Sequence, residues 1–221
     1  MKQLLLLLSG LVFTGLAATS PARDVFSDNF DSLDAGDSII SQGGWTDNSK
    51  TGSATVAHSM PAWSAPNYLD FESGGGVQHT FPAADFTSSD FTFSFYFKPD
   101  NAVTTGHNLQ LSLRKGPGYL LYLNIRGALD ALDLGIDSTS PEKKTFTGPL
   151  RKGTWYLFTA TFDHASSQIA YSITDATTRA SLLTGTLDLN PGPADRIVIG
   201  STTSTTAGDW SFDTLSLISS P

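Results

Sequence analysis

The chain has 221 residues and carries 13 Lys and Arg against 21 Asp and Glu, a formal net charge of −8. This acidic balance argues against nucleic acid as a partner, because phosphate backbones are bound by clustered positive charge. The chain contains no cysteine, which excludes disulfides and a lipid-modified cysteine anchor. About 200 residues follow the N-terminal segment, enough for the core of one domain.

The first residues are typical of an export signal. Lys2 supplies a positive charge, residues 4–16 form an apolar run too short to cross a bilayer, and small residues follow up to Ala22. The sequence therefore predicts a signal peptide over residues 1–22 and one domain over residues 23–221. It also predicts export to the periplasm or the medium. No second long apolar run follows, so no membrane span is expected.

Most later segments alternate apolar and polar residues and are rich in Phe, Thr, Val, Ile and Tyr, as half-buried strands are. Glycine and proline clusters separate them. This series predicts an all-β fold, in which two antiparallel sheets pack as a sandwich or jelly roll. The predicted strands are residues 25–30, 54–58, 68–71, 77–81, 91–98, 109–113, 120–126, 155–163, 169–174, 197–199 and 210–218.

Three neighbouring segments alternate strictly, and their polar side chains share a chemistry. In residues 91–98 four phenylalanines occupy one parity, and in residues 108–114 and 120–126 leucine and isoleucine do so. Because successive side chains of a strand point to opposite faces, the other parity would face water. If the three strands pair side by side, that face is a patch of amide, phenol, guanidinium and ammonium groups. The patch consists of Tyr96, Lys98, Asn108, Gln110, Arg114, Tyr122, Asn124 and Arg126.

This patch predicts a carbohydrate-binding surface. Amide and guanidinium groups bind hydroxyls and carboxylates, and aromatic rings stack on the apolar faces of pyranoses. Basic residues and two tyrosines gather there although the chain is acidic. The alternative is an ordinary solvated sheet face, since such faces are polar in any antiparallel sheet. Trp63, in a loop bounded by Pro61 and Pro66, is added to the ligand site as the expected exposed ring.

Aspartate, glycine and aromatic residues form three further patterns. The first is Ser-Asp-Asn-Phe-Asp at 27–31 with Gly-Gly-Trp at 43–45, and the second joins residues 89–99 to Gly-Thr-Trp-Tyr at 153–156. The third is Ile-Val-Ile-Gly at 197–200 with Trp-Ser-Phe-Asp-Thr-Leu at 210–215. In this order they resemble the concanavalin A-like superfamily of jelly rolls, in particular its laminin-G-like branch. The resemblance implies two curved sheets and a concave face that often holds carbohydrate.

The resemblance also implies one structural calcium ion between the first and last strands. It assigns the ion to Asp28 and Asp213, with Asp31 in reserve, and carbonyl oxygens and water would complete the six to eight ligands that calcium takes. Thr214 follows Asp213 where relatives often place an amide, which removes one ligand. The alternative for Asp31 is a solvated charge in a turn-rich loop.

The catalytic motifs of the superfamily are missing. Its glycoside hydrolases use a Glu-x-Asp-x-x-Glu strand, whereas Glu72 and Glu142 are the only glutamates of this chain, and Asp130 and Asp133 fall in a segment predicted as a loop or short turn. Its polysaccharide lyases neutralise a uronate with Arg and an amide and move the C5 proton with Tyr or His. Gln110, Arg114, Tyr122, Arg126 and His107 supply those residue types without the alginate-lyase motifs.

Taken together, these patterns predict an exported carbohydrate-binding protein without a recognisable glycosidase apparatus. One alternative is a polysaccharide lyase that acts on a uronate-containing polymer through the same face. Another is an adhesive domain that binds protein. The expected partner is a polysaccharide or glycan, and the expected cofactor, if any, is the calcium ion.

Overall fold

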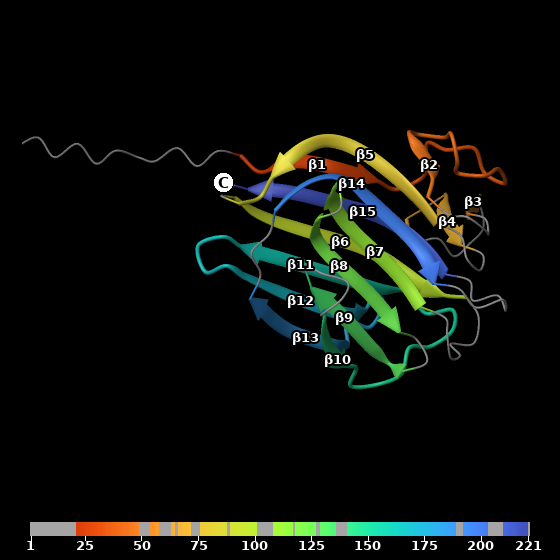
Figure 1. The fold of residues 1–221 in the computed structure, drawn as a ribbon. Helices are drawn as coiled ribbons and strands as arrows, with labels where there is room; N and C mark the ends of the chain where they lie inside the picture. The colour runs from red at the N-terminus through yellow and green to blue at the C-terminus, as the bar shows by residue number, and fades with distance from the viewer. Residues whose placement is uncertain are drawn as a thin grey trace, which may run out of the picture.

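The computed structural model in Figure 1 describes residues 21–48, 54–57, 63–64, 66–71, 76–87, 89–100, 108–116, 118–126, 129–135, 141–188, 192–202 and 210–220. Nearly all of the predicted signal peptide, and His107, lie outside these residues.

The described residues form fifteen strands and no α-helix. None of these residues therefore belongs to a helix long and apolar enough to cross a membrane. The strands are β1 Arg23–Asp28, β2 Trp45–Asp47, β3 Ala54–Ala57, β4 Tyr68–Phe71, β5 Gly76–Asp85, β6 Asp90–Pro99, β7 Asn108–Lys115, β8 Gly118–Arg126, β9 Ala131–Gly135, β10 Glu142–Thr145, β11 Tyr156–Asp163, β12 Gln168–Asp175, β13 Ser181–Asp188, β14 Pro193–Thr202 and β15 Trp210–Ser220.

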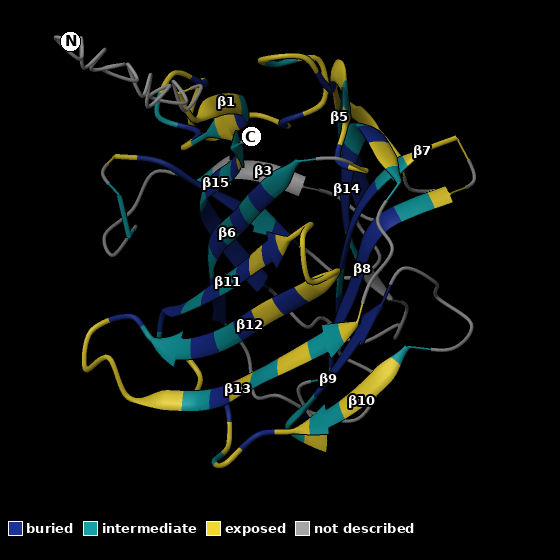
Figure 2. Ribbon diagram, turned by 90° about the vertical axis from the view of Figure 1, so that its left-hand side faces the viewer, coloured by how far each residue is buried: buried dark blue, intermediate teal, exposed yellow. Residues whose placement is uncertain are grey.

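These strands build two antiparallel sheets that pack face to face (Figures 1 and 2). Sheet A has the order β13-β12-β11-β6-β15-β4-β3, and β1 also pairs with β15. Sheet B has the order β10-β9-β8-β7-β14-β5-β2. The predicted fold class, an antiparallel two-sheet sandwich, is confirmed.

The core confirms the apolar parity of the central strands, but the expectation that the polar parity faces water is only partly met, because Lys98, Ser112, Tyr122 and Asn124 are buried as well. Phe91, Phe93, Phe95 and Phe97 of β6 are all 0% exposed, and they face the core from sheet A. The leucines and the isoleucine of β7 and β8 face the same core from sheet B. Burying one such side chain stabilises the fold by roughly 1.5–3 kcal/mol, so the alternation fixes which face of each strand turns inward.

The prediction that the three strands lie side by side is wrong for β6. β7 pairs with β8 in sheet B, whereas β6 lies between β11 and β15 in sheet A. Tyr96 and Lys98 are therefore on the outer face of sheet A, on the opposite side of the sandwich from the polar residues of β7 and β8. Period-two alternation identifies the buried face of a strand but not the sheet to which it belongs.

The expectation of a loop or short turn at Asp133 is also wrong. Ala131–Gly135 is strand β9, with Leu132 and Leu134 buried in the core, and it pairs with β8 and β10. The signal in the sequence was Ala-Leu-Asp-Leu-Gly, an alternation of only five residues. Because Asp and Gly are unfavourable in strands, this short alternation was not recognised as a strand.

Candidate functional site

The polar residues of β7, β8 and β9 come together on the outer face of sheet B. Gln110 lies opposite Asn124, which lies opposite Asp133, and residues opposite each other on neighbouring strands share a face. In the next positions along these strands, Ser112 lies opposite Tyr122 and Asn108 opposite Arg126. We call the following set the polar face: Asn108, Gln110, Ser112, Arg114, Tyr122, Asn124, Arg126 and Asp133.

Asp133 is the anchor of the polar face. Its side chain is 2% exposed, and its Oδ2 accepts hydrogen bonds from Arg126 Nε at 2.6 Å and Asn124 Nδ2 at 3.2 Å, with Arg126 Nη2 at 2.5 Å. A buried carboxylate needs such partners because its desolvation is unfavourable. The ion pair fixes Arg126 and Asn124 in position on β8.

Gln110 and Tyr122 form a second pair. Gln110 Nε2 donates a hydrogen bond to the Tyr122 hydroxyl at 3.1 Å. Burial, and then the charge of Asp133, raises the pKa of Tyr122 above its ordinary value. The phenol therefore keeps its proton at neutral pH and can donate a hydrogen bond. The ring of Tyr119 meets that of Tyr122 edge-on, with the centroids 5.8 Å apart.

Three buried polar atoms of this face have no hydrogen-bond partner in the structure: Arg114 Nε, Asn124 Oδ1 and Asp133 Oδ1. Asn124 is only 5% exposed. Nearly all buried polar groups in proteins are hydrogen-bonded, so unpartnered ones point to a ligand or to ordered water. The polar face thus holds one donor and two acceptors that have no hydrogen-bond partner and almost no exposed surface.

Tyr96, Lys98 and Trp63 belong to a separate cluster on sheet A. The Lys98 side chain is 7% exposed, its Nζ lies 2.8 Å from Asp100 Oδ1, and it sits over the rings of Tyr68 and Trp155 at 5.0 and 5.2 Å. These neighbours already satisfy the ammonium group.

Trp63 stacks on Tyr96 in that cluster, with ring centroids 4.7 Å apart, and it is half-buried rather than exposed. None of the three predicted ligand residues of this side adjoins the polar face.

The two aspartates assigned to calcium do not converge. Asp28 lies opposite Leu215, whose side chain is in the core, whereas Asp213 lies opposite Tyr96 on the outer face. The two carboxylates therefore point to opposite faces of sheet A. In a regular strand Asp213 and Leu215 would point to the same side. The register shift of β15 between Asp213 and Ser216 turns them to different sides, which the sequence pattern did not predict.

Both carboxylates are also occupied by hydrogen-bond donors. Asp28 accepts from the Phe30 N–H and from Trp45 Nε1, each at 2.7 Å. Asp213 accepts from the N–H and the hydroxyl of Ser64, each at 2.7 Å. The reserve residue, Asp31, accepts from the Asn67 N–H at 3.0 Å and from Asn29 Nδ2 at 2.8 Å. This donor set does not fit a calcium ion shared by Asp28 and Asp213. Calcium binding stays a prediction, for which calorimetric titration with the ion is the test.

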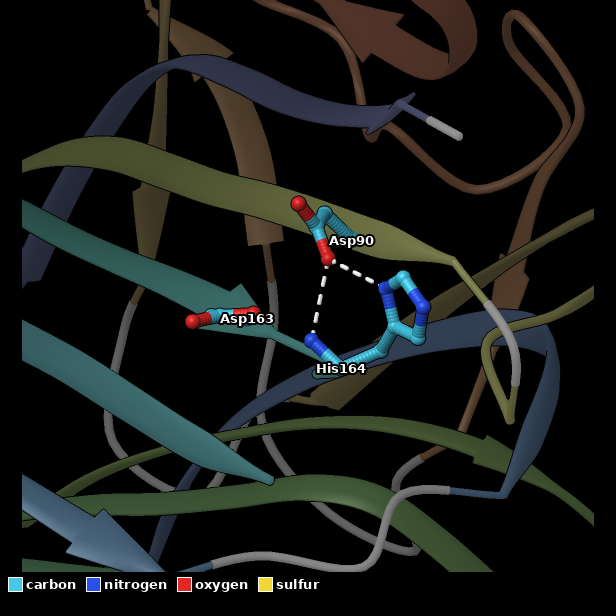
Figure 3. Close-up of side chains that lie close together, drawn as sticks. All are labelled: Asp90, Asp163 and His164. Carbon is cyan, nitrogen blue, oxygen red and sulfur yellow. Dashed lines mark hydrogen bonds and ion pairs between the residues drawn. The ribbon is translucent and has the colours of Figure 1, made fainter. Parts of the chain in front are cut away.

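Asp90, Asp163 and His164 form a separate cluster in which Asp90 is half-buried and the other two are exposed (Figure 3). Asp90 Oδ1 accepts from the His164 N–H at 2.9 Å and contacts His164 Nδ1 at 2.7 Å. Asp163 accepts from the Ala165 N–H at 2.9 Å within the turn that joins β11 to β12. These bonds tie the turn to β6 and account for the arrangement without an ion.

A pocket of about 880 Å³ lies between β1, β5 and β15, away from the polar face. Phe26 and Phe81 stack in its wall with their centroids 5.8 Å apart, and His79 Nε2 lies 2.8 Å from the Gly43 carbonyl. Asp24 and Asp28 also line it, and its lining contains no Lys or Arg among the residues that the structure describes.

The fold and sequence define the class of this protein. A laminin-G-like family model of the concanavalin A-like lectin/glucanases superfamily matches residues 72–215, so the chain belongs to that superfamily. No curated protein sequence matches the chain significantly.

Solved structures share the fold at low sequence identity. A carbohydrate esterase from Shiga toxin-encoding bacteriophage phi24B has a TM-score of 0.60 at 14% identity, covering 90% of this chain and 99% of that one. Peanut lectin has a TM-score of 0.58 at 10% identity, covering 90% and 98%. Lectin I from Ulex europaeus, solved with the methyl glycoside of alpha-L-fucose, has a TM-score of 0.52 at 11% identity, covering 79% and 90%. At these identities the likeness concerns the fold alone.

Proposed function

We propose that this protein binds carbohydrate through the polar face of sheet B. The observation that carries the proposal is the presence of three buried, unpartnered polar atoms on one face, at Arg114, Asn124 and Asp133. The Asp133 ion pair holds this face in place before any ligand arrives. Pre-positioned groups lose less conformational freedom on binding, which favours affinity.

The chemistry of these atoms suits hydroxyl groups. Asn124 Oδ1 and Asp133 Oδ1 can accept hydrogen bonds from sugar hydroxyls, and Arg114 Nε can donate one. The Gln110 amide and the Tyr122 phenol add two groups that both donate and accept. The half-buried Tyr119 ring, beside Tyr122, offers an apolar surface for a pyranose.

The same contacts give less support to a lyase. A lyase of the expected kind needs a free guanidinium for the uronate carboxylate and a tyrosine that gives up its proton readily. Arg126 is already paired with Asp133, which leaves Arg114 as the predicted lyase arginine without an acid among the described residues, and the pKa of Tyr122 is raised rather than lowered, which disfavours its role as the base. We therefore propose binding without turnover. Export stays a prediction of residues 1–22, which N-terminal sequencing of the secreted protein would test.

A glycan array tests the proposal. We expect wild-type protein to retain one group of related glycans, and we expect Gln110→Ala/Tyr122→Phe to bind them at least tenfold more weakly, about 1.4 kcal/mol. Those two side chains bond to each other, so removing both partners together should change stability little.

Ser94→Ala/Thr159→Ala is the matched control. These two residues are half-buried, lie opposite each other on the outer face of sheet A, and should not affect retention. Wild-type protein that retains no glycan, or a Gln110→Ala/Tyr122→Phe variant that binds as wild type does, would contradict the proposal.

A further inference from the structure

Two arginines lie opposite each other at one end of the outer face of sheet B. Arg196 of β14 is the register partner of Arg114 of β7. The adjacent pair, Ile197 and Leu113, is fully buried in the core, so both arginines point outward. Like charges directly opposite on neighbouring strands are unfavourable unless something neutralises them.

The acids near this pair give it little compensation. Asp195 contacts Arg196 Nε at 3.4 Å, a single long ion pair at the surface. Asp133 is engaged by Arg126, and Asp85 at the end of β5 lies near Lys115. Among the residues that the structure describes, no acid contacts Arg114, whose Nε is buried without a hydrogen-bond partner.

Neutral residues complete the surroundings of the pair. Thr80 is the register partner of Arg196, and the guanidinium of Arg114 lies over the Tyr119 ring, with Cζ 5.9 Å from the ring centroid. Stacking on an aromatic ring orients a guanidinium group and leaves its edge free for hydrogen bonds. Two neighbouring guanidinium groups are well suited to a carboxylate or sulfate, because each can donate two parallel hydrogen bonds.

The pair adjoins the polar face. Gln110 lies four residues before Arg114 on β7, a separation of about 13 Å along a strand. Its partner on β14 is Gly200, which has no side chain. On the outer face Val198 and Ser112 lie between the arginines and Gln110 in the register, and both are buried.

We propose that the carbohydrate bound by the polar face is anionic, and that Arg114 and Arg196 bind its carboxylate or sulfate group. This inference rests on the proposed function. It assigns the charge of the ligand, and it adds Arg196 to the site. The net charge of the protein is −8, so a preference for anionic ligands has to come from a local cluster of this kind.

Probes that differ only in charge test the inference. Isothermal titration calorimetry would compare hexagalacturonate with its methyl ester, and a sulfated galactan oligosaccharide with its desulfated form. The wild-type protein is expected to bind at least one anionic probe tenfold or more tightly than its neutral form. Arg114→Gln/Arg196→Gln should lose that preference, and its affinity for the neutral form should fall only by the hydrogen bond that Arg114 Nε donates, a loss that both forms share. Arg196→Gln alone should weaken the preference and keep the affinity for the neutral form. The preference should also weaken as salt is raised.

Arg151→Gln/Arg179→Gln is the matched control, because it removes the same charge from two exposed residues on loops. This control variant should keep the preference for the anionic probe, and raising the salt should weaken that preference as it does in the wild type. The melting temperature of Arg114→Gln/Arg196→Gln should be no lower than that of the wild type, because two like charges are removed. If the double variant unfolds, Arg196→Gln alone is titrated with the same probes.

The outcomes separate the two proposals. Equal binding of charged and neutral probes, or a preference that survives in Arg114→Gln/Arg196→Gln, overturns the inference and leaves carbohydrate binding standing. Binding of no probe, together with a blank glycan array, overturns the proposed function and the inference with it.

Discussion

Asp133→Ala is expected to lower the free energy of unfolding by about 3 kcal/mol and to abolish glycan binding. Removing one partner of a buried ion pair leaves the other groups without compensation, which typically lowers stability by about 3–5 kcal/mol. The Arg126 side chain is 31% exposed and can regain water, so we expect the lower end of that range. Urea denaturation followed by tryptophan fluorescence measures the change.

Asp188→Ala is the matched control for this prediction. Asp188 is also an aspartate on a strand, but it is exposed, and among the described residues its side chain accepts a hydrogen bond from Gln168 Nε2. Its replacement should change stability by no more than about 0.5 kcal/mol. If Asp133→Ala were no more destabilising than Asp188→Ala, Asp133 would not be the anchor of the polar face.

Asp213→Ala is expected to lower the free energy of unfolding by about 2 kcal/mol. Asp213 is 0% exposed and accepts hydrogen bonds from the N–H and hydroxyl of Ser64 and from the Thr214 hydroxyl. Alanine would leave the N–H and hydroxyl of Ser64 without this acceptor, whereas the Thr214 hydroxyl could still donate to Ser64 Oγ at 3.2 Å. Leaving a buried donor without an acceptor lowers stability by about 1–3 kcal/mol per group. Asp213→Asn should stay close to wild type, because its carbonyl can accept from the Ser64 N–H and its NH2 can donate to the two hydroxyls.

The stability of the wild type should also depend on pH through Asp213. Burial raises the pKa of its carboxyl above the ordinary value of 3.8, so the folded protein holds this proton more tightly than the unfolded chain does. The resulting stabilisation is fully present below pH 3.8 and is lost as the pH rises through the folded-state pKa. In urea unfolding from pH 3.5 upward, Asp213→Asn should lack this fall with rising pH. An unchanged pH profile in Asp213→Asn would assign the dependence to other groups.

The sequence predicted the faces of the central strands correctly but not their neighbours. The phenylalanines of β6 and the leucines of β7 and β8 are buried as expected, because burying hydrocarbon decides which side of a strand turns inward. Which strands pair is decided by how the chain crosses between the two sheets. Local alternation carries no record of those crossings, so Tyr96 and Lys98 were wrongly grouped with Arg114.

The candidate site shows the same division. Gln110, Tyr122, Asn124 and Arg126 were predicted from sequence and do share one face. Asp133 and Arg196 were missed because their roles depend on register: each is placed by pairing with a residue distant in the sequence. The convergence of Asp28 with Asp213 failed for a related reason, since only the register shift in β15 reveals that they face opposite ways.

The most direct test of the central claim, that the polar face of sheet B binds carbohydrate, is a nuclear magnetic resonance titration with a glycan selected on the array. The side-chain amide resonances of Gln110 and Asn124 are predicted to shift first and furthest, together with the backbone amides of β7, β8 and β9. Shifts confined to the aromatic cluster of Trp63 and Tyr96, or to the pocket beside His79, would contradict it.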